Sequence, residues 1–291
     1  MAFGGTVPPR KLVPASCGLL SVADVSEVGA SDEQWVRGFQ YEWETRPTVR
    51  LLTINDVDTT ANGGVLSSFA ANQQNYDRYI PFFIEVDDAR SMFDLPGEDR
   101  FSKVLRQINA VSQKAIEREL WDGPAAKSEA TSNIYLTKTS LATVAHAGTH
   151  KPETALAHLE DSLSNSPTGE AGVIHMTRDV ASLLWDRLVL HTEGSKQYLT
   201  TILGTPVSIG MGYTGNGPVG DVNAAASVTN RWMFASGPVS VVIGAEEVVN
   251  DTLAQGATAT INDMRIKAFR PAAVYFDPST VYTVRVDVSH A

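Results

Sequence analysis

Hydrophobic spacing changes several times along the chain, and the clearest stretch predicts one long helix. Between residues 100 and 122 apolar side chains recur every three or four positions, which places them on one face of an α-helix. The members of this face are Phe101, Val104, Leu105, Ile108, Val111, Ala115 and Leu120. Gly123 and Pro124 then end the pattern, because a helix rarely continues through such a pair. At ~1.5 Å per residue the helix would span roughly 33 Å, enough to cross a whole domain.

Further apolar patterns predict two shorter helices and a series of strands. The helices are expected over residues 152 to 164, where Pro152 suits the first turn, and over residues 177 to 191, with Gly194 as the stop. Strands are expected where apolar runs are short or alternate with polar residues. Their ranges are 133–143, 206–209, 231–235, 239–243, 264–268 and 282–288. Helices and strands are mixed without an internal repeat, which indicates an α+β fold.

The N-terminal third has few residues that could form a core. Residues 1 to 34 mix Gly, Pro and Ser without a sustained period, so we expect an extended arm whose order depends on a partner. From residue 35 to 86, short strand-like runs lie on either side of a turn signal at Asn62-Gly63-Gly64. A loop of this length inside a compact domain would be unusual, so we expect a long hairpin that projects from a domain.

Composition places the chain among globular proteins and narrows its partners. Of its 291 residues, 43% are hydrophobic and 19% are charged, and the formal net charge is -10. A surface that grips nucleic acid needs clustered Lys and Arg, which this acidic balance argues against, although a wall that only encloses DNA is compatible with it. Cys17 is the single cysteine, so an intramolecular disulfide is impossible.

The sequence indicates no targeting or membrane segment. Gly4, Gly5, Pro8 and Pro9 occupy the place where a signal peptide would have its apolar core. Residues 197 to 220 carry no charge, but their Gly, Thr, Pro and Asn content is untypical of a membrane helix. We therefore expect a soluble chain that stays inside the cell in which it is made.

One motif looks like a nucleotide site. Residues 210 to 215 read Gly-Met-Gly-Tyr-Thr-Gly and follow a predicted strand, which matches the glycine spacing of a dinucleotide-binding loop. Such a loop must open a helix whose N-terminus meets the pyrophosphate, but the following residues include Gly217 and Pro218 and favour no helix. The acidic residue expected about 20 positions later is also missing. We predict a flexible turn and no bound cofactor.

Other candidate chemistry is equally weak. His146 and His150 have the spacing of metal ligands on a helix, but Gly148 and Pro152 favour a loop, and we expect solvent-exposed histidines without a metal. The sequence lacks a nucleophile elbow and a phosphate-binding loop with its lysine. Cys17 lies in the expected arm, away from a rigid scaffold, so it does not suggest a catalytic thiol. We predict no catalytic residue and no enzyme activity.

Several stretches of the sequence nevertheless resemble one known family. Residues 114 to 123, Lys-Ala-Ile-Glu-Arg-Glu-Leu-Trp-Asp-Gly, are similar to the end of the spine helix in major capsid proteins of tailed phages. These proteins have the Hong Kong 97-type shell fold, and the similarity is greatest to phages that infect actinobacteria. Residues 35 to 42 and 79 to 85 look like the two strands of that family's extended hairpin. Residues 175 to 237 resemble its axial domain in the order of helix, glycine stop, strand, Gly-rich loop and strand.

The resemblance implies the architecture of a shell subunit. Its parts would be an N-terminal arm (1–34), an extended hairpin or E-loop (35–86), a peripheral domain (87–147 and 253–291) with its spine helix at 100–122, and an axial domain (148–252). Many copies would assemble as pentamers and hexamers of an icosahedral virion capsid that encloses double-stranded DNA without sequence-specific binding. Assembly would take place in the cytoplasm of a host bacterium. A portal protein would be a partner, and scaffold or cement proteins are further expected partners of such shells.

Shell assembly would assign contacts between subunits to two groups of residues. The arm and hairpin have little core of their own, so their apolar side chains should be buried against neighbouring subunits. These are Trp35, Phe39, Tyr41, Trp43, Phe82 and Phe83. The Gly-rich residues 210 to 220 would form the loop at the five-fold and quasi-six-fold axes, since flexible glycines suit both environments. The candidates there are Gly212, Tyr213, Gly215 and Asn216.

The sequence departs from some members of this fold at one point. Those members weld their shells through an isopeptide bond from a hairpin lysine to an asparagine of a neighbour, but here the chain has no lysine between Lys11 and Lys103. We therefore predict a shell without this crosslink. Two other functions stay open. One is an encapsulin-like bacterial compartment, which shares the fold but packages enzymes, and the other is a soluble α+β enzyme, for which the sequence nominates no cleft residues.

Overall fold

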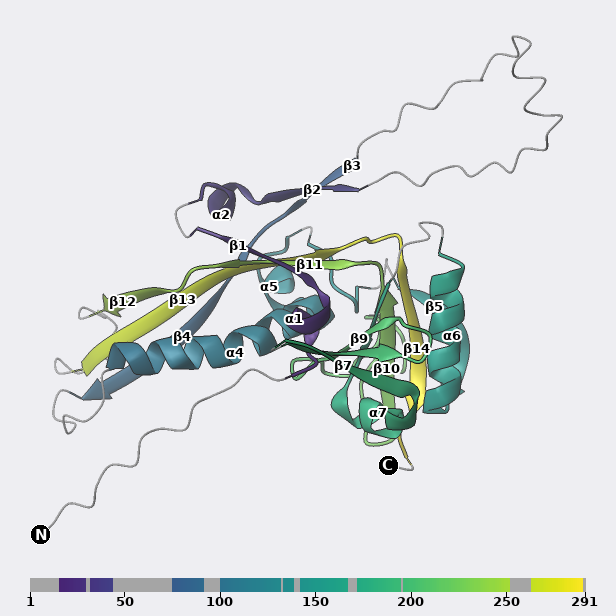
Figure 1. The fold of residues 1–291 in the computed structure, drawn as a ribbon. Coiled ribbons are helices and arrows are strands. Elements are labelled where there is room, and N and C mark those ends of the chain that lie inside the picture. The colour runs from purple at the N-terminus through teal and green to yellow at the C-terminus, as the bar shows by residue number, and fades with distance from the viewer. Residues whose placement is uncertain are drawn as a thin grey trace, which may run out of the picture.

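The structure is a computed structural model that describes residues 16–29, 32–43, 75–91, 100–131, 133–138, 142–166, 172–194, 196–251 and 263–289. Over these residues the chain forms two larger β-sheets and a two-stranded sheet, with helices packed against them (Figure 1). This arrangement confirms the expected α+β class. Much of the expected arm and hairpin, residues 1–15 and 44–74, lies outside the described residues. Among the helices that are described, none is long and apolar enough to cross a membrane.

The first sheet has five strands and is built around one long strand. This central strand, β13 (Asp263–Phe276), pairs antiparallel with β4 (Phe82–Ser91), β11 (Val239–Gly244) and β12 (Glu247–Asp251). A fifth strand, β1 (Asp24–Val28), runs parallel to β11 at the edge of the sheet. The alternating apolar residues near the C-terminus therefore form strands, as the sequence pattern predicted.

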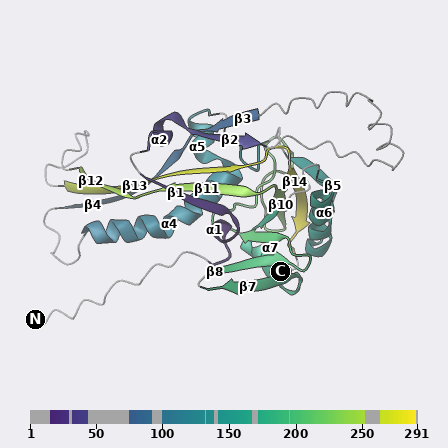
Figure 2. The ribbon, with the colours of Figure 1, turned by 45° about the horizontal axis from the view of Figure 1, so that its top comes forward.

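The helix α4 (Arg100–Asp122) forms where the apolar spacing predicted it. It lies along β4 and β13 of the five-stranded sheet in Figure 1 and Figure 2. Val104, Ile108 and Ile116 are fully buried and share one core with Ala268 of β13. Each buried side chain of this size stabilises the fold by about 1.5–3 kcal/mol, so the apolar face is what holds the helix to the sheet. Gly123, in a left-handed conformation with φ 59°, separates α4 from the short helix α5 (Pro124–Ser128).

The second sheet has seven strands in the order β5-β14-β10-β6-β9-β8-β7. Their bounds are β5 (Thr143–His150), β6 (Val173–Met176), β7 (Leu188–Glu193), β8 (Lys196–Thr201), β9 (Pro206–Ile209), β10 (Asn230–Ser236) and β14 (Val281–Asp287). The helix α6 (Pro152–Ser164) packs on this sheet through Leu156, Leu159 and Leu163, which share a core with Val284 and Val286. The helix α7 (Arg178–Leu183) and the 3₁₀ turn η1 (Trp185–Arg187) connect β6 to β7.

The chain crosses between the two sheets at two adjacent links. β10 leads into β11 through Gly237 and Pro238, and β13 leads into β14 through residues 277–280. The Gly237 N–H donates a hydrogen bond to the Thr280 carbonyl at 3.0 Å, which ties the two links together. As a result, β11 and β12 belong to the sheet that carries α4, and β14 belongs to the seven-stranded sheet. The sheets therefore do not divide the chain at residues 147 and 252, the domain boundaries expected from the resemblance.

The base of the expected hairpin is a two-stranded sheet of its own. β2 (Phe39–Trp43) and β3 (Asn75–Tyr79) pair antiparallel, with Phe39 opposite Tyr79 and Trp43 opposite Asn75. The short helix α2 (Gln34–Arg37) precedes β2, and Gly38 with φ 85° makes the turn between them. A two-stranded sheet alone is at best marginally stable in water, so its position depends on what it packs against.

The second half of the expected arm is ordered by its own chain, which differs from the prediction. The helix α1 (Leu19–Val22) packs Leu19 into the core beneath α4, where its side chain is fully buried. Cys17 is also buried, in the core of the seven-stranded sheet, and its carbonyl accepts a hydrogen bond from Ile209 N at 2.9 Å. Residues 16–29 are therefore held by contacts within the chain, chiefly those of Cys17 and Leu19. Burial raises the pKa of the Cys17 thiol, which leaves it unsuited to nucleophilic chemistry.

Three local predictions were wrong. Residues 133–138 form turns instead of a strand, and the strand β5 begins only at Thr143. His146 and His150, expected in a loop, are part of β5. The helix expected over 177–191 stops at Leu183, and residues 188–193 form β7 against β8. Apolar runs such as Leu188-Val189-Leu190 fit either period, and pairing with β8 decides in favour of the strand.

Candidate assembly surfaces

Trp35 and Phe39, expected against a neighbouring subunit, are buried in their own chain. Their rings meet edge to face with centroids 4.9 Å apart, and they pack on Val242 and Ala273 of the five-stranded sheet. The Trp35 indole N–H donates to the Gly29 carbonyl at 2.8 Å, so its polar group is also satisfied internally. Apolar side chains of β11 and β13 therefore bury Trp35 and Phe39, which we had expected a neighbouring subunit to bury. The side chains of Tyr41 and Trp43 lie outside the described residues.

Phe82 and Phe83 take opposite roles because successive residues of a strand point to opposite faces. Phe82 is half-buried and packs against the core beneath α4. Phe83 is 61% exposed, and Val36, at the end of α2, is 88% exposed. Both line one hollow of about 320 Å³, whose floor includes Trp35, Phe269 and Pro271. We call this surface the α2–β4 patch.

The rim of the α2–β4 patch is acidic. Asp32, Glu33 and Glu247 line the same hollow as Phe83. Large exposed apolar side chains that share a hollow are unusual on a monomer and are typical of surfaces that meet another protein. The shape and chemistry of the patch therefore suit an apolar side chain from a partner, flanked by basic or hydrogen-bonding groups.

A second apolar surface lies at the turn between β8 and β9. Leu203 is 74% exposed there, and Ile202 beside it is also exposed. The turn borders a groove of about 830 Å³ along α6, which Leu156, Leu163 and Arg187 also line. Val222 and Val228, on the loop before β10, are almost fully exposed as well. Like the α2–β4 patch, these positions present apolar area that the chain itself does not cover.

The Gly-rich segment proves to be a buried joint between α4 and the seven-stranded sheet. An added Cβ on Gly212 would lie 2.2 Å from the Lys114 carbonyl oxygen and 2.7 Å from Arg118 N, so the loop backbone touches the helix backbone. The Asn216 carbonyl accepts a hydrogen bond from the Trp121 indole N–H at 2.9 Å, and the Gly215 carbonyl accepts one from Trp232 N at 3.0 Å. Gly212 and Gly215 are buried, and Asn216 is half-buried. We had expected a flexible loop here. Instead the segment is packed, because glycines let its backbone approach α4 closely.

Tyr213 illustrates the same correction. It is buried, its ring packs against Trp121 with centroids 4.7 Å apart, and its hydroxyl lies 3.0 Å from His175 Nδ1 and 2.7 Å from Ser208 Oγ. This side chain therefore has little surface left for a neighbouring subunit. No helix follows residues 210–215 before β10, so the arrangement that a dinucleotide-binding loop requires is not formed by this segment.

A buried carboxylate fixes this joint. Glu117 of α4 is fully buried, and its Oε2 accepts a hydrogen bond from Gly212 N at 2.9 Å. Its Oε1 accepts hydrogen bonds from Leu19 N at 3.1 Å and from Gln113 Nε2 at 2.9 Å. One side chain thus holds together the N-terminal segment, α4 and the Gly-rich segment. The spacing of apolar and polar residues along the helix could not reveal this role, because it does not distinguish Glu117 from the other polar residues of the helix.

A Ser–His pair in the seven-stranded sheet is structural. His175 Nε2 lies 2.9 Å from Ser236 Oγ, which is within the range for a nucleophile and its base. Both side chains are fully buried, so a substrate cannot reach them. Ser236 donates its hydroxyl proton to the Gly237 carbonyl at 2.8 Å, so it accepts from His175 Nε2–H, and Nδ1 accepts from Tyr213. Burial lowers the pKa of His175 from 6.5 to about 3, which keeps the imidazole neutral.

By sequence, the chain matches no family model and no curated protein. By fold it is similar to solved shell proteins. The encapsulin of the holo-SrpI complex from Synechococcus elongatus aligns with a TM-score of 0.58 at 10% identity, over 99% of this chain and 94% of the other. The capsid of an empty GTA particle aligns with the same TM-score of 0.58 at 10% identity, over 98% and 95%.

Two actinobacterial-phage structures align over comparable lengths. The structure of Gordonia phage Cozz has a TM-score of 0.51 at 11% identity, over 98% of this chain and 91% of the other. That of Mycobacterium phage Che8 has a TM-score of 0.50 at 10% identity, over the full length of both chains. At identities this low the structural alignment indicates a shared fold and does not indicate a shared activity. The chain thus has the mixed α+β fold of the Hong Kong 97 type over nearly its whole length.

Proposed function

We propose that this chain is the major capsid protein of a tailed phage, and that many copies assemble as pentamers and hexamers of an icosahedral shell around double-stranded DNA. The observation that carries the proposal is the fold similarity to a GTA capsid and to phage structures over 98–100% of the chain. The similarity of residues 114–123 to the end of the phage spine helix is a second, independent support. In this proposal the five-stranded sheet with α4 is the peripheral domain, and the seven-stranded sheet with α6 is the axial domain.

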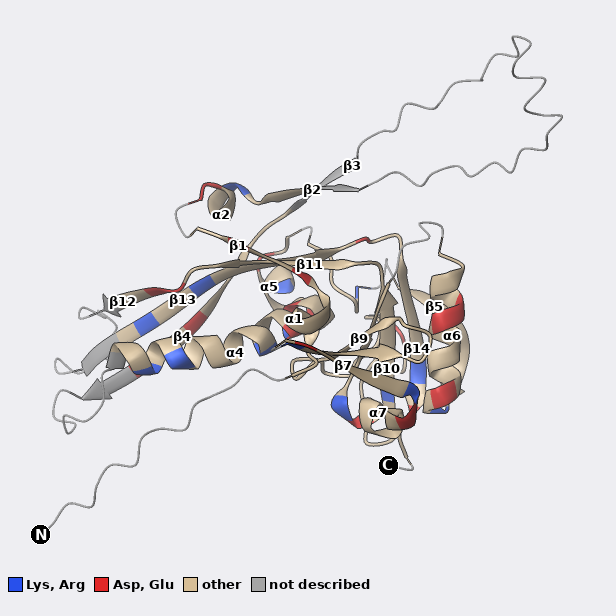
Figure 3. Cartoon of the chain, in the orientation of Figure 1, with Lys and Arg blue, Asp and Glu red and all other residues tan. Residues whose placement is uncertain are grey.

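The charge distribution suits a wall that encloses DNA without gripping it. In Figure 3, Lys and Arg are spread over α4, β13 and the region of α7, with Asp and Glu among them. The formal net charge of -10 would repel phosphate at close range. DNA enclosed in such a shell would therefore be held by the closed wall, and packaging would be independent of base sequence.

The surface next to the two-stranded sheet β2–β3 also favours assembly. The sheet itself packs on the five-stranded sheet of its own chain through Phe39 and Tyr79. Phe83, the second residue of the strand β4, presents an apolar side chain to solvent there. We propose that a second copy of this chain covers the α2–β4 patch in the shell and that a portal protein is a further partner.

Replacing Phe83 with glutamate is expected to prevent assembly and leave the subunit folded. The side chain is 61% exposed, so the fold loses little, but a charge without a partner would be buried between subunits. Central apolar residues of an interface contribute about 2 kcal/mol or more, and each shell contains many copies of the contact. Size-exclusion chromatography with light scattering would report small species in place of particles. Phe83→Leu is the matched control and should assemble, whereas normal particles from Phe83→Glu would contradict the role of the patch.

Assembled particles are expected to lack a covalent crosslink from the hairpin. The isopeptide bond needs a lysine amine there, and the chain has none between Lys11 and Lys103. After particles are boiled in denaturant, gel electrophoresis should show a single monomer band. A ladder of covalent oligomers would refute the prediction.

An encapsulin-like compartment is the second candidate, favoured by the fold similarity to the encapsulin of Synechococcus elongatus, which scores the same as the GTA capsid. The contents of native particles separate the two functions. Nuclease-resistant DNA inside the particles, together with neighbouring genes for a portal, a protease and a terminase, would support the capsid. An enclosed enzyme encoded by a neighbouring gene would support the compartment.

A further inference from the structure

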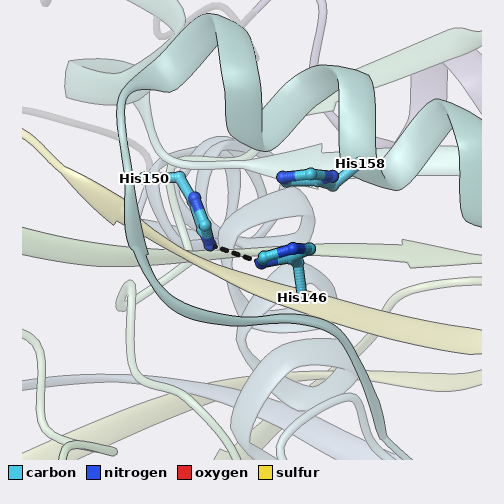
Figure 4. A group of neighbouring side chains, drawn as sticks. All are labelled: His146, His150 and His158. Carbon is cyan, nitrogen blue, oxygen red and sulfur yellow. Dashed lines mark hydrogen bonds between the residues drawn. The ribbon is translucent and has the colours of Figure 1, made fainter.

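Three of the chain's six histidines meet at one place on the seven-stranded sheet. His146 and His150 come from β5, and His158 comes from α6, which begins two residues after β5 ends (Figure 4). The His146 and His158 rings are stacked with centroids 4.2 Å apart, and the His150 ring stands edge-on to both, at 4.8 Å and 4.9 Å. His146 is exposed and the other two are half-buried, so the cluster is open to solvent.

An irregularity in β5 creates this cluster. In a regular strand, residues four apart lie roughly 13 Å from each other, too far for their rings to meet. Here β14 advances from Thr283 to Arg285 while β5 advances from Val144 to Thr149, so β5 bulges between these pairs. Gly148, with φ 101°, lies inside the bulge in a conformation that other residues rarely adopt. Bulges commonly re-aim side chains in this way, and this one brings His146 beside His150.

Two of the nitrogen atoms already have the spacing that metal binding requires, and the third lies nearby. Zn²⁺ takes imidazole nitrogens at about 2.0–2.1 Å in a tetrahedral arrangement, which separates any two of them by about 3.3 Å. His146 Nδ1 and His150 Nε2 lie 3.2 Å apart. One ligand atom from each of the three histidines lies within 4.8 Å of the others. A modest rotation of the side chains would bring all three nitrogen atoms to bonding distance of one ion.

Other polar groups lie next to the three rings. The Asp161 carboxylate, one turn further along α6 than His158, adds negative charge near the cluster, which favours a bound cation. The carbonyl of Ala147 lies 3.1 Å from both His146 Nδ1 and His150 Nε2, and a metal ion bound to these nitrogens would replace any hydrogen bond that they donate to it.

We propose that His146, His150 and His158 bind one divalent transition-metal ion, with Zn²⁺ as the best fit to three imidazoles and an open fourth position. Imidazole ligands suit Zn²⁺, Ni²⁺ and Cu²⁺, whereas Mg²⁺ and Ca²⁺ prefer oxygen ligands. The exposed side of the cluster leaves room for a water molecule as the fourth ligand. The bound ion would clamp the edge strand β5 to the first half of α6, next to the bulge that interrupts its pairing with β14.

The site is independent of the proposed function, because all three ligands come from one chain. Its test uses the full-length chain without a polyhistidine tag, stripped of metal with a chelator and then titrated with Zn²⁺ in a calorimeter. We expect one ion per chain and an increase in the thermal unfolding midpoint with saturating Zn²⁺. Co²⁺ should give the visible absorption of a four-coordinate ion, which a scattered surface site would not produce.

The variants His146→Ala, His150→Ala and His158→Ala should each weaken Zn²⁺ binding by about tenfold or more, because each removes a direct ligand. His191→Gln is the matched control, since this half-buried histidine lies on β7 at the opposite edge of the same sheet. It should bind Zn²⁺ as the unaltered chain does. Circular dichroism of the apo forms would verify that the variants fold. Stoichiometric binding that survives the triple variant, or no saturable binding by the unaltered chain, would overturn the proposal and leave the shell function untouched.

Discussion

Replacing Gly212 with alanine is expected to destabilise the chain by about 2–6 kcal/mol. The added Cβ would lie 2.2 Å from the Lys114 carbonyl oxygen and 2.7 Å from Arg118 N. Both are backbone atoms of α4, so a change of side-chain rotamer cannot relieve the clash. Overpacking of this kind costs about 1–3 kcal/mol, and moving the loop away would also remove the Gly212 N–H from Glu117, at about 1–3 kcal/mol for a buried polar group.

The measurement is the soluble yield and the thermal midpoint of Gly212→Ala beside those of Gly29→Ala. Gly29 has no atom within 4 Å of an added Cβ, so its variant controls for the substitution itself and should behave like the unaltered chain. We expect the midpoint of Gly212→Ala to fall by roughly 3–10 °C, or the protein to be insoluble. A Gly212→Ala chain as stable as the Gly29→Ala chain would contradict the buried joint.

Acid is expected to destabilise the chain through His175. Burial lowers the pKa of His175 from 6.5 in the unfolded chain to about 3 in the folded chain. Between these values the unfolded chain binds a proton that the folded chain excludes. Stability is therefore fully present above pH 6.5 and falls as the pH falls toward 3. A pKa difference of one corresponds to about 1.4 kcal/mol, so His175 lowers the free energy of unfolding by at most about 5 kcal/mol in acid.

The variant His175→Gln removes this titration, and comparing its pH dependence with that of the unaltered chain isolates the contribution. Calorimetric unfolding midpoints measured from pH 7 to pH 4 should fall more steeply for the unaltered chain than for His175→Gln. Carboxylates contribute to both curves alike and cancel in the difference. His191→Gln should keep the steep slope. Parallel curves for the unaltered chain and His175→Gln would show that the buried imidazole is not what makes the fold sensitive to acid.

The elements that the sequence predicts well are those whose apolar pattern matches one period over many residues. In α4, spacing of three and four continues from Val104 to Leu120, and both of these side chains are fully buried. In β14, Val284 and Val286 alternate and are fully buried as well. Such patterns strongly favour one secondary structure, because it puts most of their apolar side chains on one side, although Phe101 and Val111 of the predicted α4 face are exposed.

The errors arose where distant parts of the chain decide the structure. Residues 188–193 fit a helix by their own spacing, and the pairing with β8 makes them a strand. The bulge that brings His146 to His150 depends on the register with β14, which the spacing of the two histidines does not contain. The glycine at position 148 was a local signal that could have suggested a bulged strand in place of a loop, and the structure gives it a φ of 101°.

The candidate contact residues show the same limit. Trp35 and Phe39 were correctly recognised as apolar side chains that need cover, but the cover comes from β11 and β13 of their own chain. The glycines at 212 and 215 were interpreted as a source of flexibility. In the structure they let the backbone of the Gly-rich segment lie close to α4, at Gly212, and to β10, at Gly215. In both cases the sequence indicates that a residue must be packed, and only the fold shows against what.

Electron microscopy of the purified full-length protein tests the central claim most directly. We predict closed, uniform shells tens of nanometres across, built from pentamers and hexamers. The Phe83→Glu variant, purified in parallel, should give small folded species on the same grids. A folded chain that stays monomeric over the concentrations at which capsid proteins assemble would contradict the shell function.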